Sequence, residues 1–180
     1  MLSKTGRISL GVASTALFSL AAAAALAETA EESKSETIGP WEIEATFKDD
    51  KFDRCAISRT LDDDIMVTLV RTDNDLTLNL ESPNWKLERG KQYPVKMNLG
   101  PQSWDKEVAA EANSVSMDVG DEKFERGLRT ANALNLVAAG ATISVPLDKS
   151  TAALARLDEC VAKNSKAVET NPFVAPARQP

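Results

Sequence analysis

The sequence predicts a mainly β domain of the α+β class. We expect an antiparallel curled sheet or sandwich of six to eight strands, with a short helix and a C-terminal helix packed on one face. Several short runs alternate apolar and polar residues with a period of two, as half-buried strands do. Turn-forming residues separate these runs. Helical spacing occurs only late in the chain and does not alternate with strands, which disfavours a parallel βαβ fold.

The first four predicted strands lie between residues 41 and 80. Acidic turns separate the first three, and Asp73-Asn74 is so short a link that strands three and four should form a hairpin. In each strand the apolar residues fall on one face: Trp41, Ile43, Ala45 and Phe47; Cys55, Ile57 and Leu61; Ile65, Val67 and Leu69; Leu76, Leu78 and Leu80.

The second half of the chain predicts further strands and both helices. Residues 93–99 and 114–119 alternate, residues 106–113 suit either a helix or a strand, and residues 134–147 predict a hairpin with glycine at its turn. A short helix is expected over 121–130, where Phe124 and Leu128 share a face. The last helix should start at Asp148 or Ser150 and end near residue 164.

The N-terminus is typical of a secretory signal peptide. Lys4 and Arg7 precede an apolar stretch that ends in Ala25-Leu26-Ala27, and a small-x-small exit is what the peptidase requires. We expect cleavage after Ala27, with Ala30 as the second choice, and a periplasmic or secreted mature protein. A retained anchor is the alternative, but the stretch is rich in alanine and poor in bulky residues.

These boundaries predict a simple domain organisation. Residues 1–27 form the signal peptide, 28–40 a disordered leader, 41–164 a single globular domain and 165–180 a flexible proline-containing tail. The 27-residue signal peptide holds two of the 21 basic residues and no acidic one, so the mature chain has 19 basic and 27 acidic residues, a net charge of −8. Such acidity disfavours binding to nucleic acid.

The two cysteines, Cys55 and Cys160, predict one disulfide. An even number of cysteines in an exported chain favours pairing, and two cysteines allow only one connectivity. Cys55 shares the apolar face of its strand, and Cys160 lies three residues after Leu157 on the apolar face of the last helix. The bond would therefore clamp that helix to the second strand. A redox-active pair is disfavoured because the two are far from Cys-x-x-Cys spacing.

The chain contains no histidine, and this limits its chemistry. Ser-His-Asp and Cys-His systems and histidine-based metal sites are excluded. The acidic run Asp62-Asp63-Asp64 lacks the ligand pattern of a calcium loop and is interpreted as a solvated turn. We therefore expect no catalytic residue, no bound metal and no cofactor. Trp85 and Trp104 flank turns and are the candidate partner-binding residues, although both also suit the edge of the core.

One set of residues resembles a group of small exported proteins and domains of alphaproteobacteria that are largely uncharacterised. The similarity extends from residue 41 to residue 161, and its motif residues are mostly apolar residues, glycine and cysteine. They are Trp41, Phe52-Asp-Arg-Cys55, Pro83-Asn-Trp85-Lys-Leu87, Gly90, Tyr93-Pro-Val95, Phe124, Leu128-Arg129, Leu154, Leu157 and Cys160-Val161. Such residues mark a fold, so the resemblance implies no catalytic residues.

Export without catalytic residues favours a non-enzymatic periplasmic interaction module that binds a protein or envelope component. An inhibitor of a secreted hydrolase is one form of this hypothesis. The alternative is a carrier of a small apolar ligand, in which the curled sheet would enclose a cavity. A carboxylate- or metal-dependent enzyme is the least favoured alternative, since no arrangement of carboxylates in the sequence indicates a site.

Overall fold

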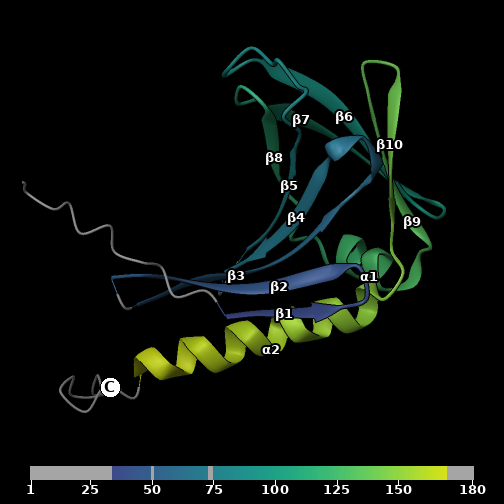
Figure 1. Ribbon diagram of the computed structural model, residues 1–180. Helices are drawn as coiled ribbons and strands as arrows, with labels where there is room; N and C mark the ends of the chain where they lie inside the picture. The colour runs from purple at the N-terminus through teal and green to yellow at the C-terminus, as the bar shows by residue number, and fades with distance from the viewer. Residues whose placement is uncertain (1–33, 50, 73–74, 170–180) are drawn as a thin grey trace, which may run out of the picture. The chain divides into compact units, whose positions relative to one another are not determined.

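Two antiparallel sheets and two helices form the part of the chain that the computed structural model describes, namely residues 34–49, 51–72 and 75–169 (Figure 1). The mainly β class predicted from the sequence is confirmed. Helix α1 spans Glu122–Thr130 and helix α2 spans Ser150–Glu169, and a 3-10 turn covers Asp62–Asp64.

The larger sheet, sheet A, has six strands in the order β1-β2-β3-β4-β5-β8, and the smaller, sheet B, has four in the order β10-β9-β6-β7. Strands β4, β5 and β8 rise steeply from the plane of β2 and β3, so sheet A is strongly curled (Figure 1). The strands of sheet A are β1 (Lys34–Ile38), β2 (Trp41–Lys48), β3 (Lys51–Thr60), β4 (Met66–Arg71), β5 (Leu76–Glu81) and β8 (Ser114–Asp118). Those of sheet B are β6 (Gln92–Leu99), β7 (Gln102–Ala109), β9 (Ala133–Ala138) and β10 (Ala141–Pro146).

The described residues form ten strands, whereas six to eight were expected. Strands β1 and β7 account for the difference. The expectation of disorder throughout residues 28–40 is wrong for Lys34–Ile38, which pair with β2 in a hairpin. Gly39 makes this hairpin possible because it adopts a positive φ of 58° at the turn. Strand β1 is almost entirely polar, and its pairing depends on backbone hydrogen bonds that hydrophobic periodicity does not reveal.

Residues 106–109 of the segment 106–113, which suited either a helix or a strand, belong to strand β7. It pairs with β6 along its whole length, yet Val108 is its only fully buried side chain. With so few buried positions, its sequence carries little periodic signal. Helix α2 continues to Glu169, so residues 165–169 are helical where a tail was expected. The predicted signal peptide and residues 170–180 of the predicted tail lie outside the described residues.

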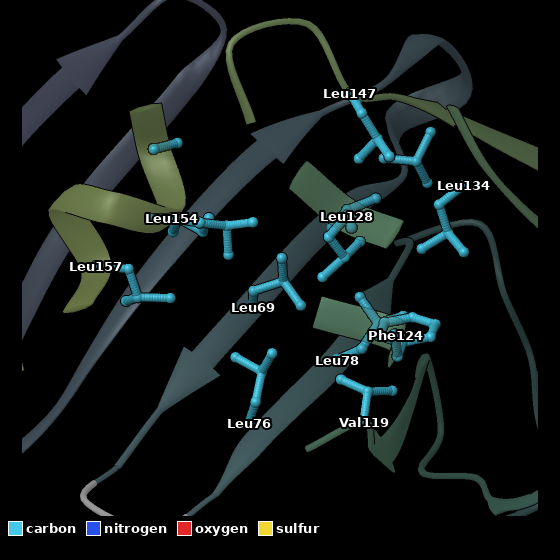
Figure 2. Close-up of a cluster of buried hydrophobic side chains, with 14 of the residues drawn as sticks. Leu69, Leu76, Leu78, Val119, Phe124, Leu128, Leu134, Leu147, Leu154 and Leu157 are labelled. Atoms are coloured by element: carbon cyan, nitrogen blue, oxygen red, sulfur yellow. The ribbon is translucent and has the colours of Figure 1, made fainter. Parts of the chain in front are cut away.

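The core lies between the inner faces of the two sheets and the two helices. Phe124 and Leu128 of α1 and Leu154 and Leu157 of α2 are each at most 1% exposed. Figure 2 shows these side chains gathered with apolar residues of sheet A and of the segments around sheet B: Leu69, Leu76, Leu78, Val119, Leu134 and Leu147. Burial of this apolar surface is the main source of stability.

A disulfide and an ion-pair network hold the helices on the sheet. Cys55 of β3 and Cys160 of α2 form the predicted disulfide across a sequence separation of 105 residues. Arg71 of β4 contacts Glu125 of α1 at 2.6 Å and Asp158 of α2 at 3.1 Å, and Arg129 of α1 contacts Asp158 at 2.7 Å. Three elements distant in sequence are therefore joined by one set of charges.

Candidate functional site

The outer face of sheet A forms a groove of about 590 Å³, which we call the sheet A groove. Because side chains alternate between the two faces of a strand, the core takes every second residue of β2 to β5 and β8 and the groove takes most of the others. Its lining residues are Glu44, Thr46, Arg54, Ala56, Ser58, Met66, Thr68, Val70, Thr77, Asn79, Glu81, Ser114, Val115 and Ser116.

A row of small polar side chains crosses the floor of this groove. The strand register places Ser58 opposite Thr68, Thr68 opposite Asn79, and Asn79 opposite Ser116. Directly opposed residues on one face of a sheet have Cβ atoms only about 4.5–5.5 Å apart. Hydroxyl and amide groups from four strands therefore stand side by side, without a charge among them.

Asn79 occupies the middle of this row and is incompletely satisfied. Its Oδ1 atom is buried and accepts no hydrogen bond from the described residues. A buried acceptor without a partner costs roughly 1–3 kcal/mol, so proteins keep few of them. The Asn79 side chain is therefore a polar group in the floor of the groove whose hydrogen-bonding capacity the described residues do not fill.

One apolar side chain stands out at the groove. Met66 is 40% exposed and is the one large hydrophobic residue classed as exposed in the described part of the chain. Val70 and Ala56, which the register places opposite each other on neighbouring strands, add apolar surface to the same face. Methionine is common at surfaces that bind other proteins because its flexible thioether adapts to different partners.

Two carboxylates flank the polar row. Glu44 lies on β2 and Glu81 on β5, and neither forms an ion pair within the described residues. Glu81 accepts a hydrogen bond of 2.9 Å from the Asn113 side chain, which leaves its charge uncompensated. The one basic residue of the lining, Arg54, already pairs with Asp53 at 2.8 Å. The groove therefore favours cationic groups at its sides.

The predicted binding residues lie elsewhere. Trp104 of β7 packs edge to face on Phe124, with ring centroids 5.1 Å apart, and Trp85 is half-buried against the core. Neither tryptophan lines the sheet A groove, so their role in binding stays a prediction. Sequence reasoning missed the groove residues, although the outward Ser, Thr and Asn positions could have been read from the same alternation that located the core.

The described residues contain no group of three or more His, Cys, Asp or Glu side chains placed to hold a metal ion. No helix in the described ranges combines the length and apolar character needed to cross a membrane.

Comparison of the chain with protein-family models, curated proteins and solved structures gave no match. The resemblance to exported alphaproteobacterial proteins therefore stays a hypothesis.

Proposed function

We propose that this protein is a non-enzymatic interaction module of the periplasm or extracellular space that binds a cationic, extended segment of a partner polypeptide in the sheet A groove. The observation that carries this proposal is the combination on one face of an uncharged hydrogen-bonding row, an exposed Met66 and two unpaired glutamates. The disulfide between Cys55 and Cys160 is consistent with an oxidising compartment outside the cytoplasm.

The floor of the groove suits a polypeptide backbone. Ser58, Thr68 and Ser116 each offer a hydroxyl that donates and accepts, and Asn79 offers an amide, so the row can pair with both N–H and C=O groups. Their small size lets a backbone approach the sheet closely. No aromatic residue lines the groove, which disfavours a sugar chain, since sugars are commonly bound by stacking on aromatic rings.

Met66 and the glutamates provide selectivity. An apolar side chain of the partner packed on Met66 would bury surface worth about 25 cal/mol per Å². Glu44 and Glu81 would attract lysine or arginine side chains on either side of it, and the net charge of −8 expected for the mature chain would speed association with a basic partner. An inhibitor of a basic secreted hydrolase is one form that this function could take.

The carrier hypothesis has less support. The groove and three further pockets are lined in part by charged side chains, including Lys96, Lys123 and Arg156. The inner faces of the sheets are filled by side chains such as Ile57, Leu78 and Met97, each 0% exposed. A carrier of apolar ligands needs an apolar cavity, and nothing in these four pockets favours one.

A crosslinking pull-down with the mature protein in its own periplasm tests the proposal. Three versions are compared: the wild type, a groove variant Glu44→Gln/Glu81→Gln/Met66→Ser, and a control Glu107→Gln/Glu122→Gln. The control removes the same two charges from exposed residues outside the groove. Far-UV circular dichroism establishes that all three are folded.

We expect the wild type and the control to retain the same partner, and the groove variant to lose it. A basic segment of that partner, made as a peptide, should bind the wild type more weakly as salt is added, because screening weakens exposed charge pairs. Equal capture by the groove variant would show that binding occurs elsewhere.

A further inference from the structure

A second concave site lies beside α1, on a different part of the molecule from the sheet A groove. It has a volume of about 610 Å³ and lies between α1, the turn that joins β6 to β7, and the start of β9. We call it the α1 pocket. Its volume falls within the range of about 300–1,000 Å³ that is usual for small-molecule sites.

One stripe of α1 forms a wall of this pocket. Lys123, Arg126, Gly127 and Thr130 all line it and are three, four and seven residues apart, as residues on one face of a helix are. Phe124 and Leu128 face the core instead. Gly127 permits the close approach of helix and sheet, because a Cβ atom added there would lie 2.9 Å from Cδ1 of Leu99.

The charged residues in the lining are both cations. Lys123 and Arg126 are exposed, form no ion pair within the described residues, and lie in a pocket without a carboxylate in its lining. The six other arginines of the described residues each have an acidic partner: Arg54, Arg59, Arg71, Arg89, Arg129 and Arg156.

Three acidic residues of the same segment lie close to Lys123 and Arg126 in sequence, and none of them forms an ion pair with either cation. Asp121 caps the helix by accepting from the backbone N–H groups of Lys123 and Phe124 at 3.0 Å. Glu125 pairs with Arg71. Glu122 lies four residues before Arg126 but makes no ion pair with it in the structure. Two like charges three residues apart repel each other on a helix, and an anion between them would relieve this repulsion.

Neutral hydrogen-bonding groups complete the α1 pocket. Gln102, Asn132 and Asn135 supply side-chain amides. Thr130 supplies a hydroxyl oxygen that can accept a hydrogen bond, since the hydroxyl itself donates to the backbone carbonyl oxygen of Arg126 at 2.9 Å. Amides bind hydroxyl and carbonyl groups, whereas a guanidinium binds carboxylate or phosphate through two parallel hydrogen bonds. We propose that the α1 pocket binds a small hydroxyl-bearing organic anion, with Lys123 and Arg126 on its phosphate or carboxylate and the amides on its hydroxyl groups.

Titration of the mature protein followed by NMR tests this site. The probes are glucose 6-phosphate, glucuronate and uncharged glucose. A variant Lys123→Gln/Arg126→Gln is compared with a control Lys86→Gln/Arg89→Gln, which removes the same two charges at the same spacing from residues outside the pocket. Circular dichroism and thermal midpoints establish that both variants are folded.

We expect saturable shifts of the Arg126 and Gly127 amides with at least one of the two anions, and affinity for glucose at least about tenfold lower. The pocket variant should lose about tenfold or more in affinity, and the control should not. Tighter binding of glucose 6-phosphate would identify a phosphate site, and tighter binding of glucuronate a carboxylate site. Unchanged affinity in the pocket variant, or no saturable shift with either anion, would overturn the proposal. The outcome of this experiment does not depend on whether the sheet A groove binds a partner.

Discussion

The indole of Trp41 donates a hydrogen bond of 2.9 Å from Nε1 to the backbone carbonyl oxygen of Asp148, 107 positions further along the chain. Arg59 lies 5.2 Å above the same indole ring and donates a hydrogen bond of 3.0 Å to Oδ1 of Asp148. The three residues join β2, β3 and the segment before α2. This contact therefore ties the first strands of the domain to its last helix.

We expect Trp41→Phe to lower the free energy of unfolding by about 2–4 kcal/mol. Trp41 is 1% exposed, so the smaller ring would leave a cavity, and the carbonyl oxygen of Asp148 would lose its donor. Urea unfolding followed by far-UV circular dichroism measures the change. Trp85→Phe is the matched control, since Trp85 is half-buried and its indole makes no hydrogen bond within the described residues; a loss as large as that of Trp41→Phe would contradict this account.

The ion pair between Arg59 and Asp148 predicts a loss of stability in acid. The hydrogen bond from Arg59 holds the pKa of the Asp148 carboxyl below its usual value of 3.8. A carboxyl whose pKa is lowered by folding stabilises the protein above its unfolded pKa, and this contribution disappears as the pH falls through the folded pKa.

Asp148→Asn should therefore destabilise the protein at pH 7, and the difference from the wild type should shrink below about pH 4. Urea midpoints measured from pH 2.5 to 7 would follow this convergence. The same substitution in an Arg59→Gln background should have little further effect at any pH. A constant difference between Asp148→Asn and the wild type down to the lowest pH would argue against the pair.

Sequence reasoning located the core because a strand that buries one face alternates apolar and polar residues along its sequence. The inward parity of Cys55 and the helical spacing of Cys160 from Leu157 were enough to predict the disulfide that the structure contains. Strand β1 was not predicted, because its side chains are almost all polar and it is held by backbone hydrogen bonds to β2. Periodicity reports what a strand buries, and β1 buries little.

The disulfide should contribute strongly to stability. It closes a loop across 105 residues, and the chain-entropy model assigns roughly 4.7 kcal/mol to a loop of about 100 residues, with measured losses of about 2–5 kcal/mol. The free energy of unfolding of Cys55→Ala/Cys160→Ala should therefore be lower by about 2–5 kcal/mol. Urea unfolding measures this change, and the midpoint should shift to a lower urea concentration. The reduced wild type should match the double variant, and a double variant as stable as the oxidised protein would exclude this role.

The two candidate sites could not be predicted in the same way. Their residues come together only through the register of β3, β4, β5 and β8 and through the approach of α1 to the turn after β6. Alternation indicates which residues of a strand face outward, but it does not indicate which residues of a neighbouring strand lie beside them, because register also depends on turn geometry. The unusual state of Asn79 is likewise visible only when its neighbours are in place.

Asn79 should show a conflict between stability and binding. Its Oδ1 atom is buried without a hydrogen bond from the described residues, and asparagine is unfavourable in a central strand. Asn79→Thr should therefore raise the free energy of unfolding by about 0.5–1 kcal/mol. Asn98→Thr in β6 is the control, because Asn98 undergoes the same change in a strand of sheet B and has no buried atom without a partner. If the groove binds a partner through this amide, Asn79→Thr should also weaken capture while the protein becomes more stable. A destabilised Asn79→Thr protein would instead show that the amide supports the fold.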